Sequence, residues 1–174
     1  MSNIILTGFM GTGKSSVGKM LAQKTGYVFC DLDAIIVGQA GMSINEIFAK
    51  HGEAYFRELE ANAVKQISSA DKQVVATGGG AVIREDNRML LRKSGIIVNL
   101  EASVEEIFSR LINDSERPLL TDRKSVEKLA ELLEQREQYY ADADIRIDTT
   151  GRKVEDVVQE ILFILRGKSG FGNS

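Results

Sequence analysis

The residues whose types and spacing point most directly to chemistry run from Gly8 to Ser15 and fit the pattern G-x-x-x-x-G-K-S/T. Glycines at this spacing let backbone N–H groups turn inward around a polyphosphate, and the start of a following helix adds unpaired donors and partial positive charge. Lys14 is expected to reach the β- and γ-phosphates, and the Ser15 hydroxyl to ligate Mg²⁺. A glycine-rich turn without a ligand would leave a lysine at a helix start, where the helix dipole disfavours it. The stretch therefore predicts phosphate binding.

Two carboxylates, Asp31 and Asp33, follow an apolar run at 27–30 that predicts a buried strand. In open parallel sheets, ligands bind at the carboxyl ends of the strands, so both carboxylates are expected near the phosphate loop. Asp31 is the candidate for the Mg²⁺ shell, because no acidic residue ends the next expected strand, at 74–77. Asp33 has two interpretations, a ligand of the substrate or the N-cap of the helix that follows.

A third group of candidate residues lies in the middle of the chain. Within Phe56-Arg57-Glu58-Leu59-Glu60, Arg57 precedes Glu60 by three residues, and this spacing alone indicates an exposed ion pair on a helix. Three glycines, 78–80, directly follow the apolar run at 74–77. Such glycines allow a ligand to approach the backbone very closely, and a flexible turn is the alternative interpretation.

The elements that must position these residues alternate along the chain. Short apolar runs predict strands at 4–6, 27–30, 74–77, 96–100 and 145–148. Helical spacing, helix-ending glycines and capping boxes at Ser43 and Ser103 predict helices at 14–25, 43–50, 53–69, 85–93, from 103, at 125–140 and at 154–165. This alternation implies an α/β fold of three layers, in which helices cover both faces of a five-stranded parallel sheet.

The stretch from about 112 to 124 interrupts this alternation, because it is polar, contains the only proline and has no clear periodicity. A polar loop of this length inside a compact domain is typical of a lid over a functional site. Residues 1–168 are expected to form one domain that includes this lid, and 169–174 to form a flexible tail.

Composition excludes several classes of partner and site. The chain has 174 residues, of which 43% are hydrophobic, enough for one core. Its net charge is −3 with acidic and basic residues intermixed, which argues against nucleic-acid or membrane partners. Cys30 is the only cysteine, which excludes a disulfide framework and favours a small buried hydrophobe. With no signal sequence and no apolar run of membrane-spanning length, the chain is expected to be cytoplasmic.

Several classes of phosphate-loop protein do not fit the remaining motifs. GTPases need an N-K-x-D motif or a close variant for guanine, and none is present. The D-x-x-G match at 148–151 falls on the last expected strand, too late for a GTPase switch, and the chain is too short for the extra elements of ring ATPases. A small phosphoryl-transfer enzyme with an acceptor pocket and a lid remains.

Along nearly its whole length the sequence resembles the shikimate kinase family. The resemblance is carried by motifs in order, namely GFMGTGKSS at 8–16, Asp31-Leu32-Asp33, Phe56-Arg57-Glu58-Leu59-Glu60, Gly78-Gly79-Gly80, Arg117-Pro118-Leu119 and Arg136. It implies a nucleoside-monophosphate-kinase-like P-loop fold with sheet order 2-3-1-4-5 and an acceptor-binding segment at about 33–61. It also implies ATP-dependent phosphorylation of the 3-hydroxyl of shikimate, on the route to chorismate and the aromatic amino acids. A monomer is expected.

On the nucleotide side, the resemblance implies that the loop holds ATP or ADP through Gly11, Thr12, Gly13, Lys14, Ser15 and Ser16. Ser15 and Asp31 would hold Mg²⁺. Arg117 would reach from the lid toward the transferring phosphate, while Arg110 and Arg152 would flank the adenine. The family often has a proline shortly after this last arginine, where this chain has Lys153 and Val154.

On the acceptor side, the resemblance implies that Asp33 hydrogen-bonds the shikimate hydroxyls and accepts the proton. Arg57 and Arg136 would pair with the shikimate carboxylate, and Gly78, Gly79 and Gly80 would approach the ring. Chemistry agrees, because planar guanidinium groups suit a carboxylate and phosphoryl transfer needs positive charge around the phosphate oxygens. Two alternatives stay open, a gluconate-type small-molecule kinase and a non-catalytic ATP-binding module.

Overall fold

The computed structural model describes residues 2–112 and 123–168. In these residues, five strands form one parallel sheet with the order β2-β3-β1-β4-β5. The strands are β1 (Asn3–Thr7), β2 (Val28–Asp31), β3 (Gln73–Ala76), β4 (Gly95–Glu101) and β5 (Ile145–Asp148). The predicted fold class and sheet order are therefore confirmed.

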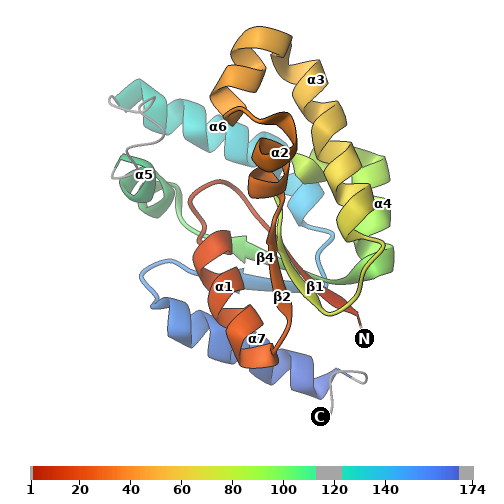
Figure 1. The fold of residues 1–174 in the computed structure, drawn as a ribbon. Coiled ribbons are helices and arrows are strands. Elements are labelled where there is room, and N and C mark those ends of the chain that lie inside the picture. Colours follow the sequence, from red (N-terminus) through yellow and green to blue (C-terminus); the bar gives the residue numbers. More distant parts are fainter. Residues whose placement is uncertain (1, 113–122, 169–174) are drawn as a thin grey trace.

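Helices cover both faces of this sheet, as Figure 1 shows. One face packs against α1 (Lys14–Thr25) and α7 (Val154–Gly167). The opposite face packs against α2 (Leu32–Ala40), α3 (Ile44–Ile67) and α4 (Glu85–Ser94). A parallel sheet needs both covers, because its strands are apolar on both sides.

The central strand shows how the sequence divides between these two cores. Ile4 and Leu6 pack with α1 and α7, while Ile5 packs with α2, α3 and α4, and all three side chains are fully buried. Successive strand residues point to opposite faces, so a short unbroken apolar run is what a strand covered twice requires. The strand order places β1 at the centre of the sheet. The loop that follows β1 therefore emerges at the middle of the carboxyl edge.

The remaining helices, α5 (Val104–Ile112) and α6 (Arg123–Tyr140), build a third apolar cluster. This cluster includes Phe9 and Val82, which follow β1 and β3. The two helices therefore lie against the carboxyl edge of the sheet, beside the phosphate loop. A short 3₁₀ helix, η1 (Ala81–Ile83), continues directly from the triple glycine.

The prediction that the second strand is buried is wrong. Strand β2 begins at Val28, whose exposed fraction is 64%, and its other residues are only partly buried. The strand lies at the edge of the sheet, so one side of it faces solvent. An apolar run cannot distinguish an edge strand from a central one, because the distinction depends on strand order.

Local signals set several helix boundaries. Ser43 forms the complete capping box with Glu46 at the start of α3, as predicted. Gly52 interrupts this helix with φ 81° and ψ 175°, which confirms the predicted break. At Ser103 only half of the box forms: the hydroxyl accepts from the Glu106 N–H, while the Glu106 carboxylate turns to an arginine. None of the described helices is long and apolar enough to cross a membrane.

Candidate functional site

The phosphate loop lies between β1 and α1. One of its glycines allows close approach to a neighbouring strand, and another takes a left-handed backbone conformation. A side chain at Gly8 would place its Cβ 2.3 Å from the Leu100 carbonyl oxygen, so the loop leaves β1 pressed against β4. Gly13, with φ 95°, is the N-cap of α1 and has a left-handed conformation that favours glycine. The loop therefore opens onto the positive end of a helix, the geometry that binds anions.

Lys14 closes the loop on itself. Its Nζ donates to the Gly8 and Phe9 carbonyl oxygens, at 2.8 and 2.9 Å. The Thr12 hydroxyl donates to the same Phe9 oxygen at 2.8 Å. The ammonium group thus lies against the loop backbone, and its contact with the β- and γ-phosphates stays a prediction.

The two predicted metal residues lie in contact. The Ser15 hydroxyl donates to Asp31 Oδ2 at 3.0 Å. The other carboxylate oxygen, Oδ1, accepts from the backbone N–H groups of Asp33 and Ala34 at the start of α2. Asp31 is therefore the N-cap of that helix, so the interpretation of Asp33 as the cap is wrong.

A hydroxyl and a carboxylate side by side are hard oxygen donors of the kind that Mg²⁺ prefers. Within the described residues, there is no group of three or more His, Cys, Asp or Glu side chains suited to a metal ion. Mg²⁺ is commonly bound through one or two protein side chains together with substrate phosphates and water. Ser15 and Asp31 fit that mode of binding.

The triple glycine is surrounded by the predicted acceptor residues. A Cβ at Gly78 would lie 3.0 Å from Asp33 Oδ1 and 3.2 Å from Glu60 Oε2. A Cβ at Gly80 would lie 2.5 Å from Arg57 Nη1, closer than any real contact allows. Helices α2 and α3 thus bring functional side chains against this backbone. The contacts at Gly78 and Gly80 therefore favour close approach over the flexible-turn interpretation.

Gly79 lies between the two halves of the site. A Cβ there would lie 3.3 Å from the Met10 backbone nitrogen and 3.5 Å from Arg136 Nη1. The guanidinium group of Arg136 also lies over the Phe9 ring, 5.4 Å from its centroid. The structure therefore brings Arg136, on α6, to the contact between the phosphate loop and the triple glycine.

Arg57 pairs with Glu60 at 2.8 Å and with Glu53 at 3.3 Å. The Glu60 side chain is only 2% exposed, so the predicted pair forms but its predicted exposure is wrong. Burial raises the pKa of Glu60, and the nearby Arg57 guanidinium opposes that shift. Glu60 is a site residue that we did not predict, because its spacing from Arg57 shows pairing but not burial.

Tyr140 is a second site residue that we did not predict. Its hydroxyl donates to the Gly79 carbonyl oxygen at 2.6 Å, although it ends a helix 61 residues further along the chain. Burial raises the pKa of Tyr140 to about 12, so the hydroxyl stays protonated and remains a donor. A tyrosine within an amphipathic helix resembles any core residue in sequence, so no local signal marks it.

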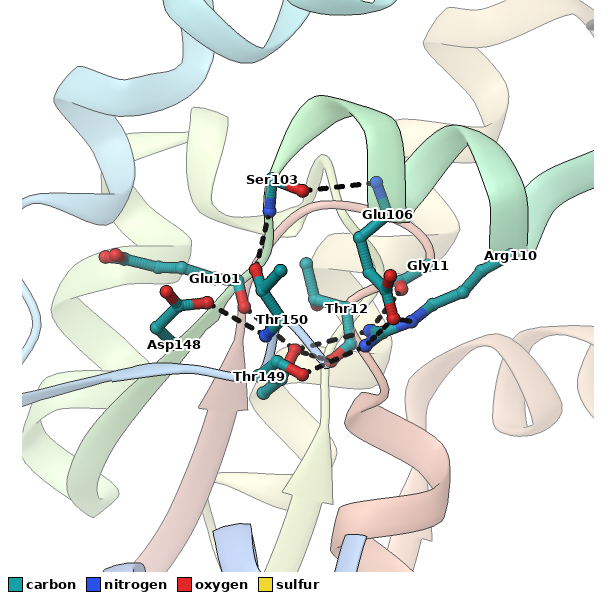
Figure 2. A network of polar contacts seen from close by, with 9 residues as sticks. All are labelled: Gly11, Thr12, Glu101, Ser103, Glu106, Arg110, Asp148, Thr149 and Thr150. Atoms are coloured by element: carbon teal, nitrogen blue, oxygen red, sulfur yellow. Dashed lines mark hydrogen bonds and ion pairs between the residues drawn. The ribbon is translucent and has the colours of Figure 1, made fainter. Parts of the chain in front are cut away.

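The predicted adenine residues take different positions. Arg110 lies on the outer side of the phosphate loop, where it donates to the Gly11 carbonyl oxygen at 3.0 Å and pairs with Glu106 at 2.9 Å (Figure 2). Arg152 pairs with Glu160 at 2.6 Å, along α7. The structure thus brings Arg110 to the loop. Arg152 precedes α7 and pairs with a residue of that helix.

The other predicted residues follow the loop or lie outside the described chain. Gly11, Thr12, Gly13 and Ser15 belong to the loop and the first turn of α1, and Ser16 follows them with an exposed side chain. Arg117, most of the predicted lid and the predicted tail fall outside the described residues.

Comparisons with known proteins agree with this geometry. A model of the shikimate kinase family matches residues 10–166. A shikimate kinase of Geobacter metallireducens is 59% identical over 166 residues, which cover 95% of this chain and 93% of the relative. The solved structure of an Acinetobacter baumannii shikimate kinase in complex with shikimate is 38% identical, with a TM-score of 0.90, and the match covers 97% of this chain and 96% of that one.

A more distant solved structure bears on the gluconate alternative. A gluconokinase from Sinorhizobium meliloti is 20% identical, with a TM-score of 0.58, and the match covers 91% of this chain and 88% of that one. At this identity the likeness extends to the fold alone. The family match and the 59% identical relative show that this chain belongs to the shikimate kinase family.

Proposed function

We propose that this protein transfers the γ-phosphoryl group of ATP to the 3-hydroxyl of shikimate, forming shikimate 3-phosphate. The observation that carries this proposal is the convergence of Asp33, Arg57 and Arg136 on the triple glycine, next to the phosphate loop. Two guanidinium groups and a carboxylate suit a substrate with one carboxylate and several hydroxyls. The related A. baumannii enzyme, solved in complex with shikimate, supports the same substrate.

In the proposed mechanism, Arg57 and Arg136 pair with the shikimate carboxylate and fix the ring. Asp33 orients the attacking hydroxyl and accepts its proton. Lys14 neutralises charge on the β- and γ-phosphate oxygens, with Arg117 approaching from the lid. Phosphoryl transfer needs positioning and positive charge more than covalent chemistry, so these roles suffice.

Ser15 and Asp31 would hold Mg²⁺, which would supply further positive charge at the phosphate oxygens. Gly11, Thr12, Gly13 and Ser16 would bind the phosphates, while Arg110 and Arg152 would flank the adenine. We further propose a monomer in which residues 1–168 form one domain, with an acceptor-binding segment at about 33–61 and a lid at about 112–124.

Release of ADP, measured with a coupled assay, tests this function. We expect release that depends on shikimate, with little ADP formed from ATP alone or with gluconate. Gluconate-dependent release would instead identify a gluconate-type kinase. Tight ATP binding without release for either acceptor would identify a non-catalytic ATP-binding module.

A further inference from the structure

Thr149 connects three parts of the nucleotide side and belongs to the D-x-x-G match at 148–151, which the proposed function leaves without a role. It follows β5 and is only 3% exposed. Its backbone N–H donates to the Glu101 carbonyl oxygen at 2.8 Å, and its carbonyl oxygen accepts from Arg110 at 3.1 Å. Its hydroxyl oxygen lies 3.1 Å from the carbonyl oxygen of Thr12, a residue of the phosphate loop (Figure 2).

The surroundings of this hydroxyl offer its single proton two acceptors, the Glu101 and Thr12 carbonyl oxygens. A threonine hydroxyl has one proton to donate and two lone pairs that accept. Arg110 Nη1, at 3.3 Å, can donate to a lone pair. The Glu101 carbonyl oxygen is 2.8 Å from the hydroxyl but already accepts the Thr149 N–H. Since the Glu101 oxygen keeps the Thr149 N–H as a donor in either case, the hydroxyl can turn its proton to the Thr12 oxygen at 3.1 Å.

The orientation of the Thr12 carbonyl determines where the next N–H points. A peptide unit is planar and trans, so the Thr12 C=O and the Gly13 N–H point in opposite directions. Holding the carbonyl toward Thr149, outside the loop, directs the Gly13 N–H to the opposite side, where a phosphate would lie. The Gly13 carbonyl is held by the Val17 N–H of α1, and a contact at the Thr12 carbonyl would restrict the peptide on the other side of this conformationally free residue.

We propose that Thr149 is a positioning residue for phosphate binding: its hydroxyl fixes the Thr12–Gly13 peptide with the Gly13 N–H turned into the loop. This inference rests on the proposed nucleotide site. It assigns to Thr149 no contact with the substrate: the residue acts through the Thr12 carbonyl. Arg110, held by the Thr149 carbonyl, fixes the Gly11 carbonyl on the same outer side.

The test compares Thr149→Val, which keeps the shape and removes the hydroxyl, with Thr149→Ser, which keeps the hydroxyl. Calorimetry would measure the binding of tripolyphosphate and of adenosine to each. We expect Thr149→Val to weaken tripolyphosphate binding about 3- to 10-fold, the scale of one net hydrogen bond, with adenosine binding unchanged. Thr149→Ser should bind tripolyphosphate as the native chain does. The matched control is Thr150→Val, since Thr150 accepts from the Ser103 N–H instead of contacting the loop.

Native tripolyphosphate affinity in Thr149→Val, with only a lower melting temperature, would overturn the proposal and leave a packing role. If the valine variant does not fold, the serine variant still decides, because weakened tripolyphosphate binding in a folded Thr149→Ser would overturn it too. Tripolyphosphate binding needs no acceptor. A failure of the proposed function would appear separately, as absence of shikimate-dependent ADP release in the native chain.

Discussion

Asp33 lies beside the triple glycine, where we propose that the two substrates meet. It is the second residue of α2, its backbone N–H is held by the Asp31 cap, and its Oδ1 faces Gly78. Replacement by asparagine keeps the shape and one acceptor oxygen and removes the charge. We expect Asp33→Asn to lower kcat by roughly 10²–10⁴, the range for a lost general base, with an unchanged Kd for ADP. Steady-state kinetics and calorimetry measure these two quantities.

Turnover of Asp33→Asn near the native rate would remove Asp33 from the mechanism. The helix cap cannot then explain the residue, because Asp31 occupies that position. Asp31→Asn is the useful comparison, since it alters both the cap and the contact with Ser15. Asp31→Asn should raise the Mg²⁺ concentration needed for half-maximal turnover. Asp33→Asn should leave that concentration unchanged.

Arg57 and Arg136 are expected to pair with the same substrate carboxylate from different helices. We therefore expect Arg57→Met and Arg136→Met each to raise the KM for shikimate by about ten- to a hundredfold, with little change in the KM for ATP. That is the scale of a hydrogen bond to a charged group, about 1.5–3 kcal/mol. An equal rise in the KM for shikimate and the KM for ATP in a variant would point to a folding defect instead.

The two arginine variants should differ in stability. Glu60 is buried and its main partner is Arg57, so Arg57→Met leaves a buried carboxylate without that partner. Because burial already raises the pKa of Glu60, protonation favours the folded state. Stability from this group is present at low pH and is lost as pH rises through the folded-state pKa. The melting temperature of Arg57→Met should therefore fall more steeply than that of Arg136→Met as the pH rises above about 4.3, the usual pKa of a glutamate.

At the scale of elements, α6 contacts the triple glycine through Tyr140 as well as Arg136. Tyr140→Phe removes the hydrogen bond to the Gly79 carbonyl and keeps the ring in the core. We expect a several-fold higher KM for shikimate and an unchanged Kd for ADP, because the phosphate loop keeps its own contacts. An unchanged KM would limit Tyr140 to packing.

The raised pKa of Tyr140 also predicts how the free energy of unfolding depends on alkaline pH. An unfolded tyrosine ionises near pH 10, whereas burial raises the pKa of Tyr140 to about 12 in the folded protein. The stability from this group is complete below pH 10 and is lost as pH rises toward 12. Unfolding free energies from urea titrations should therefore fall more steeply between pH 9.5 and 11 for the native chain than for Tyr140→Phe. Parallel curves would contradict the burial of this hydroxyl.

The elements also show what could be predicted from the sequence. Unbroken apolar runs located the strands, and Ser43 and Gly52 located helix boundaries, because these signals act within a few residues. The exposure of β2 was missed because it depends on strand order. Glu60, Tyr140 and Thr149 act through burial or through contacts far along the chain, which periodicity does not report. Arg57 was assigned to the site by resemblance alone.

At the scale of the whole molecule, the nucleotide and acceptor sites meet where Gly79 approaches the backbone of the phosphate loop. A Cβ at Gly79 would lie 3.3 Å from the Met10 nitrogen, so we expect a ligand in the phosphate loop to restrict the motion of the acceptor backbone. Once the first ligand has ordered this backbone, the second ligand no longer loses the corresponding conformational entropy on binding. We expect ADP to tighten shikimate binding about fivefold or more, and shikimate to tighten ADP binding by the same factor. Calorimetric titrations in both orders measure this coupling.

A coupling factor of one in both orders would show that the approach of Gly79 to the loop transmits nothing. Unequal factors would violate linkage and indicate that binding had not reached equilibrium. Adenosine is the control ligand, because it lacks the phosphates that would occupy the loop. It should leave shikimate binding unchanged.

The separation in sequence between the phosphate loop and Thr149 also affects the order in which they are synthesised on the ribosome. Thr149 follows Ser15 by 134 residues (149 − 15), and β5 and α7 also come late in the chain. At ~5–20 residues per second, a ribosome needs about 7–27 s to synthesise that stretch. During this interval the nascent chain has its glycine loop but not the residue that orients it. Cellular ATP should therefore protect the released protein from proteolysis but not chains stalled before codon 149.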